Sequence, residues 1–154
     1  MRHINVKEIL SNQFENGKFC KYDIIIRYMF IREYYRKNKP ELFRHKLYSI
    51  LAKARDTKDR SKKFLRLIQS FEENGFDESY PIEMSGNFYI CGATHRVALC
   101  LYFGIEEVPY KINDSCKRKR RRFTKSWLKK NGFKKHIESI EKTKNKLFKK
   151  LGIN

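Results

Sequence analysis

The side chains best suited to chemistry form one run of five residues: Gly92, Ala93, Thr94, His95 and Arg96. An apolar segment precedes the run, and an apolar helix is predicted directly after it, over Val97–Phe103. The first amides of a helix have no internal partners and carry the positive end of the helix dipole, so they attract anions. Gly92 and Ala93 allow a close backbone approach, and the guanidinium of Arg96 can bind two phosphate oxygens. The run therefore predicts a phosphate-binding turn.

Each of these residues also has a purely structural interpretation. A corner between a strand and a helix needs small residues for steric reasons alone, and Thr94 is a suitable N-cap. His95 can orient or protonate a phosphate oxygen, or it can make a structural hydrogen bond to a neighbouring strand. For Arg96 the binding interpretation is favoured, because a buried guanidinium needs an anion.

A carboxylate near the turn would extend binding to catalysis. Phosphoryl transfer needs a carboxylate that holds a metal or takes the proton of the acceptor. Glu83, on the segment before the turn, is the best candidate, although a solvated glutamate on a strand is the favoured interpretation. Glu72, Glu73 and Asp77 are weaker candidates.

The segments around the turn predict a coherent unit. Pro81–Met84 and Phe88–Cys91 read as two strands joined by a hairpin turn at residues 85–87. Gly104 ends the following helix, and Val108–Ile112 reads as another strand.

This region, Phe64 to Ile112, resembles the ParB/sulfiredoxin superfamily. The matching positions are Leu67, Ser70, Gly75, Pro81, Ile82, the run Gly92 to Arg96, Ala98, Gly104, Ile105 and Pro109. The resemblance implies that the turn cradles nucleotide phosphates, as it does for ATP in sulfiredoxins, ADP in the free serine kinases and CTP in the partition proteins. It also implies that a basic residue ahead of the core reaches the phosphates. The candidates for that residue are Arg55, Arg60, Lys62 and Lys63.

Departures from these families limit what carries over. Thr94 stands where sulfiredoxins have a catalytic cysteine, which argues against reduction of sulfinic acids. Gly92-Ala93 stands where the serine kinases have Asp-Gly. The chain is also too short for the full DNA-binding domain of the partition proteins.

Composition indicates a globular protein with one core. The 154 residues include 12 Phe and 9 Tyr, and no segment reaches the roughly 18 apolar residues of a membrane span. Four cysteines, Cys20, Cys91, Cys100 and Cys116, lack metal-site spacing, so neither a zinc site nor a disulfide is predicted. Cys91 and Cys100 are expected to be core thiols. A reducing cytoplasm is the simplest location.

Charge is concentrated in the tail. The net charge is +19, and from residue 113 onward 16 Lys or Arg face three acidic residues, which leaves +13 there. A continuous basic run comprises Lys117, Arg118, Lys119, Arg120, Arg121 and Arg122. Such a run binds nucleic acid or another polyanion, or it is a solvated surface. Tyr89 and Trp127 could stack on a base, although packing is the favoured role for both.

Helical patterning dominates the remainder. Helices are predicted over residues 23–37, 41–53 (with Leu42 on the apolar side) and 61–74, where Ser61 is the expected cap. In the tail, residues 124–130 and 135–151 are expected to form two helices docked on the core.

These observations predict an α/β (α+β) protein with a small mixed sheet. Its parts are a helical extension at 1–60, a ParB/sulfiredoxin-like core at 61–112 and a basic helical tail at 113–154. The expected function is binding of ATP or ADP, or alternatively CTP, with Mg²⁺. Phosphoryl transfer to a small hydroxyl-bearing or sugar-related acceptor is a further step of that hypothesis. A non-enzymatic nucleic-acid-binding protein is the alternative.

Overall fold

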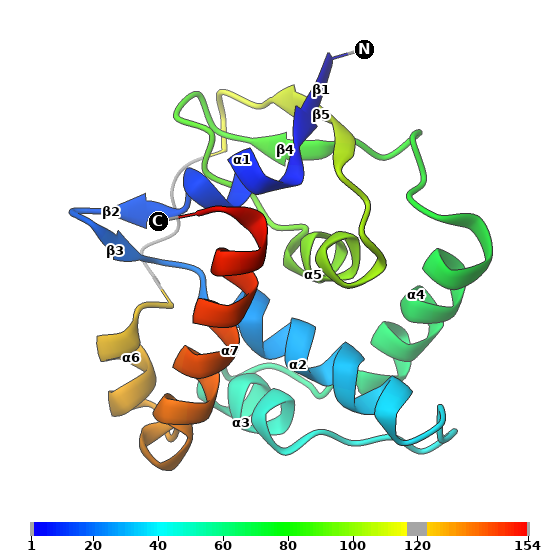
Figure 1. Cartoon of the computed structure of the whole chain (residues 1–154), viewed down its shortest axis with the longest axis vertical. Helices are drawn as coiled ribbons and strands as arrows, with labels where there is room; N and C mark the ends of the chain where they lie inside the picture. The colour runs from blue at the N-terminus through cyan, green and yellow to red at the C-terminus, as the bar shows by residue number, and fades with distance from the viewer. Residues whose placement is uncertain (1, 117–122, 154) are drawn as a thin grey trace.

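A three-stranded mixed sheet lies at one end of the molecule, in a computed structural model that describes residues 2–116 and 123–153 (Figure 1). Its order is β1 (Arg2–Asn5), β5 (Glu107–Ile112) and β4 (Ile82–Met84), with β1 antiparallel and β4 parallel to β5. A separate hairpin joins β2 (Phe14–Glu15) to β3 (Lys18–Phe19). The fold is therefore mixed α/β, as predicted. The first strand comes from a segment whose sequence is weakly patterned.

The parallel strands β4 and β5 are connected by α5 (Thr94–Phe103), which supplies the crossover that parallel pairing requires. The predicted unit of strand, turn, helix and strand is thus present. Its second hairpin strand, predicted over residues 88–91, is wrong. Only one bridge, between Met84 and Ile90, forms there. Phe88 adopts a left-handed φ of 62°, which takes the chain out of the extended conformation.

Helix α2 (Tyr22–Arg36) is the centre of the core, and α5, α3 (Lys46–Ala54) and α7 (Ile137–Leu151) pack around it (Figure 1). Its consecutive residues 24–26, all isoleucine, are fully buried. Because neighbouring helical positions point about 100° apart, burying three in a row requires partners on several sides. The helix predicted over residues 23–37 is confirmed.

One predicted helix start and one predicted helix cap are wrong. Residues 41–45 are not helical, so α3 begins only at Lys46, and Leu42 is 82% exposed instead of facing the core. Helix α4 (Ser61–Asn74) begins at Ser61, which is therefore not its cap. The N-cap position is Arg60, whose side chain makes no capping bond, and the carboxylate of the preceding Asp59 accepts from the Ser61 amide at 2.8 Å and from the Ser61 hydroxyl.

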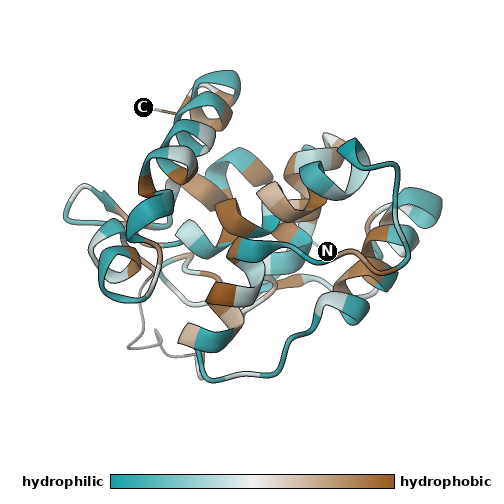
Figure 2. Cartoon of the chain, turned by 90° about the horizontal axis from the view of Figure 1, so that it is seen from below, coloured by the Kyte–Doolittle hydropathy of each residue, from teal (hydrophilic) through white to brown (hydrophobic). Residues whose placement is uncertain are grey.

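The C-terminal helices are docked on the core. They are α6 (Lys125–Lys130), the 3₁₀ turn η1 (Lys134–His136) and α7. Ile140, Leu147 and Phe148 are buried, and the Tyr22 hydroxyl donates to Glu141 at 2.8 Å. Hydrophobic residues gather in the middle of the molecule and hydrophilic residues on its periphery (Figure 2). At the opposite end of the chain, the short helix α1 (Val6–Ser11) packs against α5.

Candidate functional site

The turn between the sheet and α5 has an unusual backbone. Gly92 has a φ of 130°, and Ala93 has a φ of 59°, in the left-handed region. That conformation costs a residue with a side chain roughly 1–2 kcal/mol, and such strain clusters at functional sites. No atom lies within 4 Å of a Cβ placed on Gly92, so the space beside the turn is open. The N-cap of α5 is Ala93 and no side chain caps the helix, so the expected capping by Thr94 is wrong.

The five residues of the turn line two different cavities. Thr94 and His95 line a cavity of about 180 Å³, which we call the basic pocket. Gly92, Ala93 and Arg96 line another of about 270 Å³, which we call the turn pocket. The predicted phosphate cradle is therefore divided.

Arg27 lines the basic pocket, although it lies on the central helix α2. Its side chain is only 2% exposed. Its Nη1 donates to the Asp23 carboxylate at 3.0 Å and to the Asp23 carbonyl at 3.2 Å, and its Nε donates to His95. No described residue accepts a hydrogen bond from the remaining terminal nitrogen, Nη2. A buried guanidinium with a free donor beside a cavity is ready to receive an anion.

The protonation of His95 follows from its partners. Arg27 Nε lies 3.2 Å from His95 Nε2, and the Tyr48 hydroxyl lies 3.0 Å from the same nitrogen. Since an arginine N–H can only donate, Nε2 is an acceptor and the ring carries its proton on Nδ1. Burial, followed by the charges of Arg27, Arg55 and Arg60, lowers the pKa of His95 to about 2. His95 is therefore neutral at physiological pH, a form better suited to orienting its neighbours than to supplying a proton.

Positive charge dominates the basic pocket. Arg55, Lys58 and Arg60 line it together with Arg27, and none of its lining residues is acidic. Burial lowers the pKa of Arg27, and the nearby charge of Arg55 lowers it further. The carboxylate of Asp23 acts in the opposite direction and raises it. Four cations around so small a volume repel one another, and a bound anion would relieve that repulsion. Of the four basic candidates named from the sequence, Arg55 and Arg60 reach this pocket.

The turn pocket combines opposite charges. Glu83 pairs with Lys111 at 2.9 Å, and the hydrogen bond from Lys111 lowers the pKa of Glu83. Arg96 donates to the carbonyl of Tyr80 and lies over the ring of Phe76 at 5.5 Å. An ionised, paired carboxylate is a weak base, so Glu83 is better suited to positioning than to proton abstraction.

The two residues predicted to be catalytic are thus in different cavities, Glu83 in the turn pocket and His95 in the basic pocket. The weaker candidates lie in neither pocket. Glu72 binds Lys39 at 2.5 Å, and Asp77 accepts from the Ser79 amide at 3.0 Å. Glu73 is exposed on α4.

The aromatic candidates are packed. The Tyr89 hydroxyl donates to the Phe14 carbonyl at 3.1 Å, and the Trp127 ring lies against Phe123 and Phe133. The basic run 117–122, predicted to bind polyanions, lies outside the described residues.

Cys91 and Cys116 form a disulfide, which corrects the prediction of no disulfide and of a free core thiol at Cys91. Spacing in the sequence gave no signal for it, because the two cysteines lie 25 positions apart along the chain. Cys20 and Cys100 are free and buried, and burial raises the pKa of Cys100 to about 12. Since disulfides are rare in the cytosol, the pairing lends no support to the expected location.

Sequence reasoning missed Arg27 and Tyr48, both of which contact His95. For Arg27 a signal was present: it is a charged residue inside the helix predicted over residues 23–37, and apolar residues occupy most sides of that helix. Such a residue needs a buried partner or a ligand.

The chain matches no protein-family model, no curated protein and no solved structure. Within residues 2–116 and 123–153, no three His, Cys, Asp or Glu side chains are grouped as metal ligands would be. Over the same ranges no helix has the length and apolarity needed to cross a bilayer.

Proposed function

We propose that this chain binds the phosphates of a nucleotide in the basic pocket. The observation that carries the proposal is the buried Arg27, which faces a cavity lined by Arg55, Lys58 and Arg60 and by no carboxylate. Thr94 adds a hydroxyl, and the start of α5 adds unpaired amides. Every one of these groups favours a compact, highly charged anion.

The resemblance to the ParB/sulfiredoxin superfamily supports the same assignment. In that superfamily the corresponding turn binds ATP, ADP or CTP, and here Thr94 and His95 of the turn line the basic pocket. A basic residue ahead of the core was expected to reach the phosphates. Arg55 and Arg60 fit that expectation.

The structure supports phosphoryl transfer to a small hydroxyl-bearing acceptor less directly than it supports phosphate binding in the basic pocket. Glu83, the proposed acceptor-side carboxylate, lines the turn pocket and is paired with Lys111. The residues lining the basic pocket do not fit a protein-held Mg²⁺, which prefers carboxylate oxygens. Their four cations neutralise phosphate charge instead.

Calorimetric titration with tripolyphosphate, ATP, ADP and CTP tests the proposal. Arg55→Ala removes one cation of the pocket, and we expect its affinity for all bound phosphates to fall about 10- to 100-fold, the worth of one charge-assisted hydrogen bond. Arg66→Ala is the matched control, because Arg66 is exposed on α4 and lines neither pocket. Equal affinity of the two variants would refute the assignment.

The second candidate is polyanion binding by the tail. Exposed lysines lie along α6, η1 and α7: Lys125, Lys129, Lys130, Lys134, Lys135, Lys142, Lys146, Lys149 and Lys150. Binding of duplex DNA that weakens steeply with salt, and that Arg55→Ala leaves unchanged, would favour this candidate.

A further inference from the structure

The basic pocket is too small for a whole nucleotide. Its volume is about 180 Å³, whereas pockets that enclose small-molecule ligands span roughly 300–1,000 Å³. Phosphate groups fit such a volume, and the rest of the ligand has to extend out of it. The cavities next to the basic pocket therefore decide where the remainder lies.

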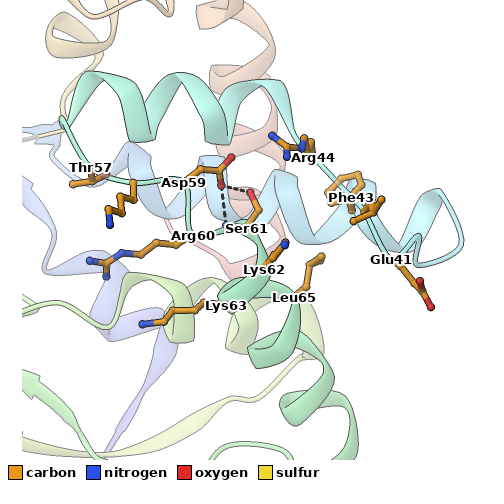
Figure 3. Close-up of a pocket in the computed structure, with 12 residues that line it drawn as sticks. Glu41, Phe43, Arg44, Thr57, Asp59, Arg60, Ser61, Lys62, Lys63 and Leu65 are labelled. Carbon is orange, nitrogen blue, oxygen red and sulfur yellow. Dashed lines mark hydrogen bonds between the residues drawn. The ribbon is translucent and has the colours of Figure 1, made fainter.

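A larger cavity of about 530 Å³, which we call the loop pocket, adjoins the basic pocket. Thr57, Lys58 and Arg60 line both cavities. The turn pocket, in contrast, shares no lining residue with the basic pocket. The loop pocket lies between residues 41–44 and the start of α4 (Figure 3). A ligand anchored at Arg60 has a direct route into it.

The lining of the loop pocket is both apolar and polar. Leu42, Phe43 and Leu65 line the pocket, and of these three only Leu42 is exposed, at 82%, which is unusual for a large apolar side chain here. Asp59 uses Oδ1 for both of its bonds to Ser61, and no described residue donates to its Oδ2 (Figure 3). An apolar wall beside a free carboxylate oxygen suits a heterocyclic base joined to a hydroxylated sugar.

We infer that the loop pocket holds the nucleoside of a nucleoside polyphosphate whose phosphates lie in the basic pocket, an assignment that rests on the proposed function. Leu42 contacts the base, and Asp59 accepts a hydrogen bond from a ribose hydroxyl. These two residues then give nucleotides a higher affinity than inorganic polyphosphate, which reaches only the basic pocket.

The test compares tripolyphosphate with ATP, GTP, CTP and UTP by calorimetry on the full chain. We expect at least one nucleotide to bind about tenfold more tightly than tripolyphosphate, the worth of burying one leucine-sized apolar contact. Leu42→Asn should remove that advantage and leave the affinity for tripolyphosphate unchanged. The variant is safe for folding because Leu42 is exposed.

Tyr80→Asn is the comparison variant, since Tyr80 is 67% exposed and lines the turn pocket. It should bind every ligand like the wild type. An advantage lost in Tyr80→Asn but kept in Leu42→Asn would overturn the inference, as would equal affinity of the wild type for tripolyphosphate and all four nucleotides. In both cases phosphate binding itself would stand. If tripolyphosphate and the nucleotides all fail to bind, the proposed function falls and the inference falls with it.

Discussion

Arg27 and His95 define the chemistry of the basic pocket by constraining one another. The guanidinium can only donate, so the imidazole must accept, and the imidazole therefore stays neutral. In this arrangement Arg27 contributes charge and His95 contributes orientation. The role expected for His95 as a proton donor remains a prediction. The low pKa of His95 opposes that role, because the ring carries no proton on Nε2 at neutral pH.

Buried neutral histidines make stability depend on pH. Burial lowers the pKa of His95 to about 2 and that of His45 to about 4. In the unfolded chain both titrate near 6.5, so between those values the unfolded state binds more protons. The free energy of unfolding should therefore level off above pH 6.5 and fall as the pH decreases below it, by up to about 1.4 kcal/mol per pH unit for each histidine.

Urea unfolding at intervals between pH 5 and 7 measures this slope, above the range where carboxylates titrate. His95→Gln keeps a hydrogen-bond acceptor for Arg27 and Tyr48 and should flatten the slope, and His45→Gln should do the same. A slope that neither substitution changes would show that these histidines are not buried in neutral form.

At the scale of elements, Gln13 positions the turn that leads into the site. It is fully buried between α1 and the segment after β4. Its Nε2 donates to the carbonyls of Ile9 at 2.8 Å and Phe88 at 3.0 Å, and its Oε1 accepts from the Ile90 amide at 3.3 Å. One amide thus satisfies backbone groups that the missing strand would otherwise have paired.

Gln13→Ala should lower the free energy of unfolding by about 2–3 kcal/mol, because it leaves buried backbone groups without partners. Asn12→Ala is the matched control: its side-chain amide bonds only the Glu8 carbonyl at 2.9 Å, at the surface, and should cost less than about 1 kcal/mol. Chemical denaturation of both variants provides the comparison. Equal losses would mean that Gln13 does not support the turn.

For the whole molecule, the disulfide ties the start of the turn to the segment that leaves β5. Closing a loop of this length should stabilise the oxidised chain by roughly 3 kcal/mol. Cys116→Ser should lose that stability without reductant and match the reduced wild type with reductant. Titration of the denatured, oxidised wild type should find two free thiols, those of Cys20 and Cys100. Four thiols would show that the disulfide does not form.

Several features of the site and fold could be predicted because local patterns encode them. The broad apolar surface of α2 indicates burial on more than one face, and small residues beside an apolar run predicted the turn at Gly92. The apolar stripe of α7 predicted that the tail docks. The helix start at residue 41 and the cap at Ser61 were wrong, because periodicity does not record that residues 41–45 are not helical or that the Ser61 amide is bonded by Asp59.

The sequence by itself determined where most of the longer helices lie, where the chain turns into α5 and how strongly basic the molecule is, since propensity, periodicity and charge act over a few residues. Only the tertiary structure decided that β1 pairs with β5 across about a hundred residues, that Arg27 and Tyr48 meet His95, and that the turn divides its side chains between two pockets. These features arise from packing between distant segments, which a pattern along the chain does not record. The candidate site depends on them, because its charge comes from Arg27 on α2 and from residues 55–60 before α4, whereas the turn adds only the uncharged side chains of Thr94 and His95.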